Sequence, residues 1–347
     1  MTEAVTQVLT DPLLLSYVSD FTSTLVLDAT CSQVKEARSQ CAQFRLKANF
    51  TGRYWYDAKF RAAVLARARR PGQQVTVKFV IDSLEKILCI EPVFNEVSLG
   101  LYFRYLTVDV VDVELTMMSV RELYLNECDI KSDCTERFAA RYPNLKKLYV
   151  YYSSFDLRML QKWPALTHLC FADSRSSVSP EETGKAISTL GNLINIELGT
   201  ELDLALVGVL PNVNVVRISR HWTNLHLLPR VFPNMNRLML DIPLNNSLSF
   251  LADCENLLDL SVYAHEILSL PIIRKLKRLS VMHRGWTKHA QMSIIERIIR
   301  MEKLEMLYIP DLNPSLVPLI AQAKNLVSLT IRAGRPGPGR RFRHLHD

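Results

Sequence analysis

The sequence predicts an α/β solenoid in which stacked repeats each contribute one short strand to a curved parallel sheet. In the stretch YPNLKKLYVYY, Leu145, Leu148 and Val150 are separated by three and then two positions. That spacing fits neither the 3.6-residue period of a helix nor the strict alternation of a strand. The same frame occurs ten times between residues 120 and 331, at intervals of 19 to 28 residues, and an asparagine precedes its first apolar residue in six cases.

The spacing assigns each apolar residue of the frame a place in the repeat. The second and third residues alternate on a short strand and point into the solenoid, while the first enters the core from the preceding turn. Each repeat buries its apolar face only against its neighbours, so stability comes from stacking. The ten triplets are Val120/Leu123/Leu125, Leu145/Leu148/Val150, Leu166/Leu169/Phe171, Leu193/Ile196/Leu198, Val213/Val216/Ile218, Met235/Leu238/Leu240, Leu257/Leu260/Val262, Leu276/Leu279/Val281, Leu304/Leu307/Ile309 and Leu326/Leu329/Ile331.

Short apolar segments between the strands predict irregular helical turns on the convex side of the sheet. A repeat of 20 to 29 residues has room for one strand and one such turn. The segments are FAARYP (138–143), LRMLQKWP (157–164), KAISTLGN (185–192), IIERIIRMEK (294–303) and VPLIAQAKN (317–325).

Two segments upstream of residue 120 extend the predicted sheet toward the N-terminus. Phe94, Val97 and Leu99 continue the repeat frame. The alternating sequence VTVKFV of residues 75–80 predicts a further strand.

The first forty-three residues predict a small helical piece. Asp11 is placed to cap a helix with Pro12 at its first position, and a second helix runs to about Arg38. The end of a solenoid needs a cover, so a plain helical cap is one interpretation of this segment. The apolar side of the first helix consists of Leu13, Leu14, Tyr17 and Val18.

Two stretches resemble the F-box/leucine-rich-repeat family. VRELYLNECDIKSDCTERFAARYPNL resembles the cysteine-containing leucine-rich repeat of that family, with Cys128 where many repeats keep an Asn or Cys. LLLSYV resembles the first F-box helix, and ATCSQVKEA resembles its V-C-x-x-W segment, with Cys31 at the cysteine and Val34 where the tryptophan is expected. The chain as a whole therefore resembles a leucine-rich-repeat solenoid behind an F-box-like segment.

This resemblance implies a substrate-recognition subunit of a cullin-type ubiquitin ligase. The target protein would bind the concave face, and the ligase adaptor would bind the N-terminal helices. The alternative is a leucine-rich-repeat scaffold or adaptor without a ligase. The adaptor-binding residues implied are Leu13, Leu14, Tyr17, Val18, Cys31 and Val34.

Positive charge is concentrated in residues 44–70, which contain eight basic residues and one acidic residue, Asp57. The net charge of this segment is therefore +7, equal to the formal net charge of the whole chain. Aromatic residues interleave with this charge, which is the composition of a surface that binds nucleic acid. From Tyr56 to Arg69 the same residues also fit an amphipathic helix. In that helix Phe60 and Val64 would face inward and Arg61 and Arg67 would be solvated.

Outward-facing strand residues are the candidate binding residues. They occupy the second, fourth and sixth positions after each opening apolar residue, and tyrosine and arginine often carry the energy of binding at interfaces. Tyr124, Tyr149 and Tyr151 predict an aromatic cluster near the start of the concave face. The predicted partner-binding set is Tyr124, Asn126, Lys147, Tyr149, Tyr151, His168, Glu197, Arg217, Arg237, Tyr263, Arg278 and Tyr308.

No known catalytic motif occurs in the chain. The Walker, dinucleotide-binding, nucleophile-elbow and zincin sequences are all missing, so we predict no enzyme activity, cofactor or metal. Seven scattered cysteines without a C-x-x-C pair, no long apolar run and no signal sequence predict a cytoplasmic or nuclear protein. The predicted domains are an F-box-like segment or cap (1–43), the solenoid (44–334) and a basic tail that does not fold (335–347).

Overall fold

The computed structural model falls into two compact units. The N-terminal unit comprises residues 1–168 and 173–177, and the C-terminal unit comprises residues 169–172 and 178–347. The helices predicted before residue 43 and the tail predicted at 335–347 lie outside the described residues. Those residues are 43–46, 57–68, 74–81, 98–105, 107–108, 116–130, 135–176, 178–219, 222–241, 248–263, 270–282, 288–310 and 312–332.

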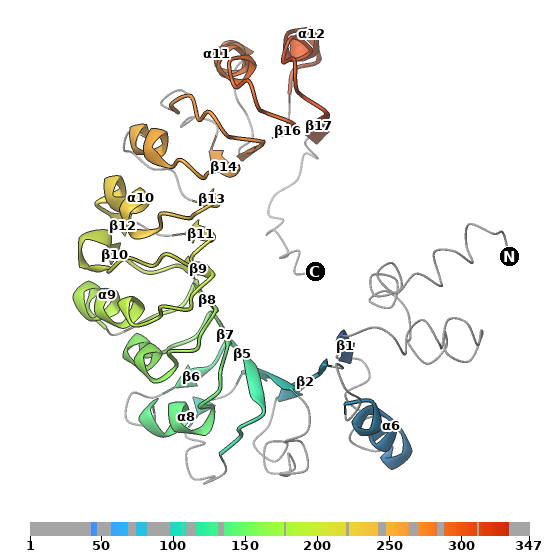
Figure 1. Ribbon diagram of the computed structural model, residues 1–347, viewed down its shortest axis with the longest axis vertical. Coiled ribbons are helices and arrows are strands. Elements are labelled where there is room, and N and C mark those ends of the chain that lie inside the picture. The colour runs from blue at the N-terminus through green and yellow to red at the C-terminus, as the bar shows by residue number, and fades with distance from the viewer. Residues whose placement is uncertain are drawn as a thin grey trace, which may run out of the picture. The chain divides into compact units, whose positions relative to one another are not determined.

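The N-terminal unit contains a parallel sheet in which β1, β2, β3, β5 and β7 lie side by side in that order (Figure 1). A short two-stranded sheet, β4 with β6, follows two of these strands. The strand bounds are Gln43–Leu46 (β1), Gln74–Ile81 (β2), Ser98–Arg104 (β3), Thr107–Val108 (β4), Val120–Asn126 (β5), Asp129–Ile130 (β6) and Lys147–Tyr151 (β7). The helical segments are Ala58–Ala68 (α6), Thr135–Arg141 (α8) and Leu157–Lys162 (η4).

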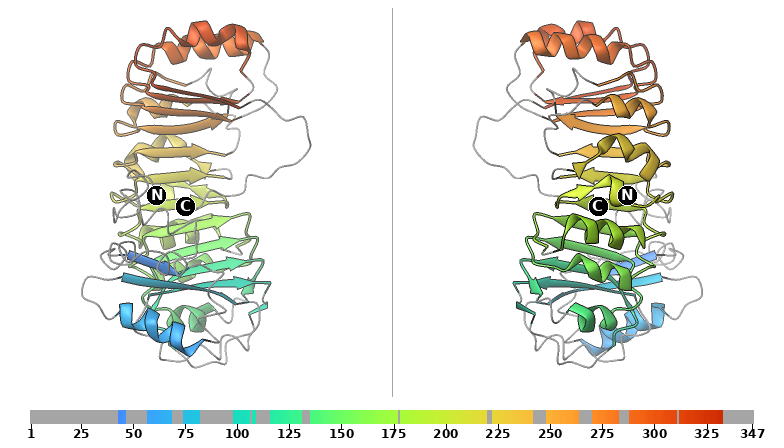
Figure 2. Two further views of the ribbon diagram at one scale, coloured as in Figure 1. Left: turned by 90° about the vertical axis from the view of Figure 1, so that its right-hand side faces the viewer. Right: turned by 90° about the vertical axis from the view of Figure 1, so that its left-hand side faces the viewer.

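The C-terminal unit continues the same plan, with β8, β9, β11, β13, β14, β15, β16 and β17 in consecutive order. Its helical segments lie on the outer side of its curved sheet (Figures 1 and 2). The strands are His168–Ala172 (β8), Asn195–Leu198 (β9), Leu202–Asp203 (β10), Val215–Ile218 (β11), Trp222–Thr223 (β12), Arg237–Leu240 (β13), Asp259–Tyr263 (β14), Arg278–Met282 (β15), Met306–Pro310 (β16) and Ser328–Arg332 (β17). The helical segments are Pro180–Ser188 (α9), Leu204–Leu206 (η5), Leu225–Leu227 (η6), Leu228–Val231 (α10), Ser249–Asp253 (η7), Lys288–Ile299 (α11), Pro314–Leu316 (η9) and Val317–Ile320 (α12).

The apolar triplets form the core, as the repeat frame predicts. In the first nine triplets no side chain is more than 2% exposed. Equivalent residues stand in register on neighbouring strands, for example Leu238 beside Leu260 and Leu279 beside Leu307. Burying one such side chain stabilises the fold by about 1.5–3 kcal/mol. The prediction of a leucine-rich-repeat solenoid with convex helical turns is therefore confirmed.

The tenth triplet differs because β17 is the last described strand. Leu326 and Leu329 are only partly buried, and Ile331 is 42% exposed. Val327 beside them is 86% exposed. This repeat has the frame of the others without their full burial.

The asparagines that precede the frame connect neighbouring repeats. For five of the six asparagines the side-chain amide donates to a backbone carbonyl of the preceding repeat, and one such hydrogen bond contributes about 0.5–1.5 kcal/mol. The bonds run from Asn144 to Met118 (3.0 Å), Asn212 to Gly191 (2.8 Å), Asn234 to Pro211 (2.9 Å), Asn256 to Pro233 (3.1 Å) and Asn325 to Glu302.

Small polar residues form a second connection between repeats in the N-terminal unit. The backbone N–H of Cys128 donates to Ser153 Oγ at 2.9 Å, and the N–H of Ser153 donates to Ser174 Oγ at 3.2 Å. The thiol of Cys128 donates to the carbonyl of Asn126 at 3.5 Å. Buried loop groups are satisfied in this way, so serine can replace the asparagine or cysteine expected at this place.

The register of β3 corrects one sequence prediction. The strand predicted at residues 75–80 is β2, and the predicted extension of the sheet at Leu99 is β3. The place of Leu99 in the repeat frame is wrong, while Phe94 and Val97 lie outside the described residues. Leu99 pairs with Val120, an irregularity follows, and then Leu101 pairs with Leu123 and Phe103 with Leu125. Leu101 and Phe103 are buried, at 0% and 2% exposure. Several aliphatic residues alternate here, so the pattern fits more than one register.

Local sequence explains where two helices begin. The carboxylate of Asp57 accepts a hydrogen bond from the N–H of Phe60 at 3.0 Å, which caps α6, and the Phe60 ring is 8% exposed. Helix α9 begins with a capping box between Ser179 and Glu182, with Pro180 in its first turn. A helix in the segment predicted at 56–69 is confirmed; the side chains of Val64, Arg61 and Arg67 lie outside the described part of the structure.

Candidate functional site

The outward positions of the strands form the candidate binding surface of each unit. Alternation on a strand separates the inward leucines from these side chains. All twelve predicted partner-binding residues lie on strands β5 to β16, at outward positions. Arg237 and Arg278 are exposed, Tyr124 is buried at 8%, and the others are partly exposed. Their role in binding stays a prediction.

A stack of three tyrosine rings crosses the N-terminal sheet. Tyr102 pairs in register with Tyr124, and Tyr124 with Tyr149. The ring centroids of the two pairs are 3.9 and 4.3 Å apart, with interplanar angles of 10° and 5°. Both faces of the Tyr124 ring are therefore covered by aromatic neighbours. The predicted cluster contained Tyr151 in place of Tyr102; in the structure Tyr151 is aligned with Asn126, one row further along.

An ion pair lies beside this stack. Glu122 and Lys147 approach to 3.0 Å, with side-chain exposures of 10% and 27%. The phenol of Tyr124 donates to the second oxygen of Glu122 at 3.3 Å. Burial, and then the Glu122 carboxylate, raise the pKa of Tyr124 far above its usual value, so the phenol remains a donor. Burial and then the ammonium group of Lys147 lower the pKa of His168, so its imidazole is neutral at neutral pH.

An ionic network crosses three strands of the C-terminal unit. The guanidinium of Arg217 pairs with Glu197 at 3.4 Å and forms a close ion pair with Asp241. The side-chain exposures are 25% for Arg217, 13% for Glu197 and 18% for Asp241. Burial alone would lower the pKa of Arg217, but the two carboxylates raise it. The phenol of Tyr263 donates to the backbone carbonyl of Asp241 at 2.9 Å.

A second ionic group lies further along the same sheet. Asp259 Oδ2 is 3.4 Å from Arg237 Nε and 3.3 Å from Arg278 Nε. The carboxylate is 12% exposed, whereas the side chains of the two arginines are 47% and 55% exposed.

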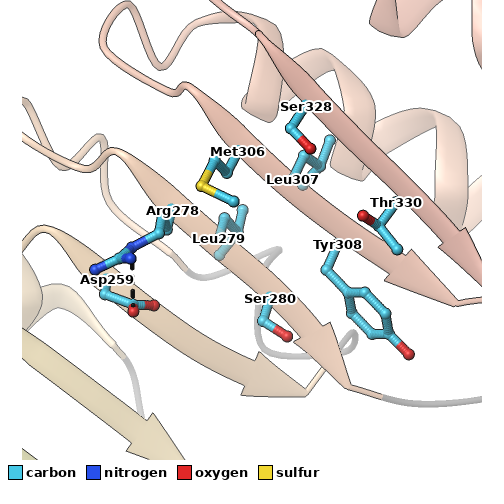
Figure 3. Close-up of a pocket in the computed structure, with 9 residues that line it drawn as sticks. All are labelled: Asp259, Arg278, Leu279, Ser280, Met306, Leu307, Tyr308, Ser328 and Thr330. Carbon is cyan, nitrogen blue, oxygen red and sulfur yellow. Dashed lines mark ion pairs between the residues drawn. The ribbon is translucent and has the colours of Figure 1, made fainter. Parts of the chain in front are cut away.

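A shallow pocket of about 150 Å³ adjoins Arg278 (Figure 3). Met306, which is 46% exposed, and the ring of Tyr308 supply the apolar side chains of its lining, while Leu279 and Leu307 are core residues with 1% and 2% exposure. The lining residues are Asp259, Arg278, Leu279, Ser280, Met306, Leu307, Tyr308, Ser328 and Thr330.

The potential metal ligands and the cysteines of the described part of the chain do not form a metal-binding cluster. No group of three His, Cys, Asp or Glu side chains there could hold a metal ion. The cysteines described, Cys128, Cys170 and Cys254, are buried and form no disulfide. Burial and then Asp253 raise the pKa of Cys254 to about 12, which leaves it protonated and unreactive at neutral pH. None of the described helices is long and apolar enough to cross a lipid bilayer.

Sequence reasoning missed Tyr102 and the pocket residues Ser280, Met306, Ser328 and Thr330. Tyr102 was missed because β3 was placed in the wrong register. The alternation of Leu99, Leu101 and Phe103 around it is the signal that could have identified its outward position. The pocket has no sequence signature, since neighbouring repeats supply its residues.

Comparisons with known proteins bear on the fold alone. No protein-family model matches the chain, and a search of curated proteins finds no match. An internalin (inlF) of Listeria monocytogenes is similar in structure with 12% identity and a TM-score of 0.36, covering 62% of this chain and 76% of its own. Internalin C2 of the same organism has 17% identity and a TM-score of 0.34, covering 64% and 82%. A leucine-rich-repeat protein of Leptospira interrogans has 14% identity and a TM-score of 0.40, covering 76% and 73%. Similarity at this level says nothing about the partners of this chain.

Proposed function

We propose that the protein is a non-enzymatic interaction module that holds a protein partner on the outward faces of its sheets. The observation that supports this most strongly is the pre-arrangement of charged and tyrosine side chains on both sheets. The tyrosine stack and the Arg217 network hold side chains in place before a partner arrives, which lowers the entropy cost of binding. Solenoids of stacked repeats commonly bind through such extended faces.

The test compares sheet-face variants with a variant on the convex side. Proteins cross-linked to the full chain would be identified for the wild type, Tyr149→Ala and Arg217→Ala. Lys185→Ala on α9, where the side chain is 66% exposed, is the matched control. We expect partners that are lost with at least one sheet-face variant and kept with Lys185→Ala, while circular dichroism shows that every variant is folded. Partners that survive both of these substitutions and also Arg278→Ala on β15 would refute the proposal.

The finer form of the proposal is a substrate-recognition subunit of a cullin-type ubiquitin ligase. It is supported by the resemblance of residues 1–43 to an F-box, which depends on sequence only. The full chain and a Leu13→Asp/Leu14→Asp variant would be assayed for co-purification of the ligase adaptor. We expect recovery with the wild type and loss with the variant. Equal absence of the adaptor from both would leave a scaffold without a ligase.

The alternative of nucleic-acid binding through residues 44–70 has less support. Helix α6 buries Phe60, which favours a structural role for this segment. The Tyr124 ring, covered on both faces, offers no surface on which a base could stack. Titration of the full chain with single-stranded RNA at low salt tests the alternative, because phosphate contacts predict binding that weakens steeply as salt rises.

A further inference from the structure

We propose that the C-terminal unit recognises a partner segment in which a carboxylate neighbours one apolar side chain. The carboxylate would pair with Arg237 and Arg278, and the apolar side chain would enter the pocket beside Arg278. This inference rests on the proposed function, because it names the kind of segment that the sheet face would bind.

The charge balance around Asp259 favours an acidic partner. Two guanidinium groups approach the same carboxylate oxygen, at 3.4 and 3.3 Å, so the group carries an excess of one positive charge. Among the described residues, Asp259 is the acidic side chain that forms an ion pair with either arginine. Roughly half of each arginine side chain is exposed. A guanidinium group has five N–H donors in a planar fork, so donors remain for a second carboxylate.

The neighbouring Arg217 network has the opposite charge balance. Arg217 lies between two carboxylates, Glu197 and Asp241, so that network carries an excess of one negative charge. Its arginine is 25% exposed, about half as much as Arg237 or Arg278. The negative excess of the Arg217 network would repel an incoming carboxylate. The positive excess of the group formed by Asp259, Arg237 and Arg278 would attract it. Opposite charge on adjacent patches orients a partner as well as binding it.

The pocket accounts for the apolar half of the predicted segment. Figure 3 shows the apolar side chain of Met306 next to Arg278, with the hydroxyl groups of Ser280 and Tyr308 further along the strands. A cavity of about 150 Å³ inside a protein core can hold a benzene molecule, so the volume of this open pocket matches about one apolar side chain. Its place beside Arg278 requires the apolar side chain and the carboxylate to be close together in the partner.

A phage-displayed library of random short peptides, selected on the immobilised full chain, tests the inference. We expect enrichment of Asp or Glu next to Leu, Met or Phe. A synthetic peptide with the enriched sequence would then be titrated by fluorescence anisotropy against the wild type and three variants. Arg278→Gln should weaken its binding about tenfold or more, because the charge-assisted pair is lost. Ser280→Leu should weaken binding by filling the pocket.

Lys277→Gln is the matched control. This substitution removes one positive charge from the residue next to Arg278. The ammonium group of Lys277 pairs with Glu305 at 2.8 Å, and Lys277 does not line the pocket. It should change affinity less than about twofold, as expected for an exposed pair. Absence of acidic enrichment, or equal binding by Arg278→Gln and the wild type, would overturn the inference. If uncharged peptides bind and are lost with Tyr149→Ala, this inference fails while the proposed function stands.

Discussion

Replacement of Gly184 by alanine tests how closely the convex turns of neighbouring repeats pack. Gly184 lies within α9, against the η5 turn of the next repeat. A Cβ atom at this position would lie 2.8 Å from the carbonyl oxygen of Leu206 and 2.9 Å from its Cβ. Ordinary contact begins at 3.4 Å, so the two turns would have to separate by about half an ångström. Ser188 limits this movement, because its hydroxyl donates to the Gly184 carbonyl (2.7 Å) and accepts from the Gly208 N–H (2.8 Å).

The expected magnitude is the difference between two effects. Overpacking of a well-packed contact costs about 1–3 kcal/mol. Alanine in place of glycine within a helix contributes about 0.8–1.0 kcal/mol in the opposite direction. We therefore expect Gly184→Ala to lower the free energy of unfolding by about 1 kcal/mol.

Gly191→Ala is the matched control, because no atom lies within 4 Å of its added Cβ. It should leave stability unchanged or raise it by about 0.4–1 kcal/mol, since alanine restricts the unfolded chain. Urea unfolding followed by circular dichroism gives the midpoint of each variant. A Gly184→Ala midpoint equal to or above that of Gly191→Ala would refute the close packing of α9 against η5.

Further predictions concern the core, a strained turn and pH. Leu238→Ala should cost about 2–5 kcal/mol, but Leu329→Ala in the last described repeat only about 1 kcal/mol; equal losses in urea unfolding would contradict their different burial. Tyr152 has a left-handed backbone (φ 50°) and a ring that is 48% exposed. Tyr152→Asn should raise the free energy of unfolding by about 0.5–1 kcal/mol, seen as a higher thermal midpoint; a lower midpoint would argue against strain. The pKa of His168 in the folded protein lies below its pKa in the unfolded chain, which is about 6.5. The neutral imidazole therefore contributes fully to stability above pH 6.5. This contribution is lost as the pH falls from there toward the folded pKa. As the pH is lowered from 7.5 to 5, the free energy of unfolding of the wild type should therefore fall relative to that of His168→Gln. A difference in urea midpoints that does not change with pH would count against a buried neutral imidazole.

The repeat frame could be predicted from sequence because it depends on local alternation. An inward leucine such as Leu148 or Leu169 is distinguished from its outward neighbours by the two-residue period of a strand, which needs no knowledge of other repeats. The asparagines before the frame were visible as a pattern. Their role was not, because the carbonyl that five of the six bind belongs to the preceding repeat.

The register between strands could not be predicted in the same way. A shift of two residues leaves every side chain on the same face, so the alternation of Leu99, Leu101 and Phe103 is equally satisfied by more than one pairing. The structure selects the pairing that places Tyr102 beside Tyr124. The tyrosine stack depends on this choice, and so Tyr102 escaped the sequence prediction.

The sequence by itself determined that the chain forms repeats, which residues enter the core and which face outward, because those properties follow from hydrophobic spacing along the chain. Only the tertiary structure decided which outward side chains meet. Arg237 and Arg278 share Asp259, whereas Arg217 lies between Glu197 and Asp241, because these contacts join residues about 20 positions apart whose distance depends on how neighbouring repeats stack.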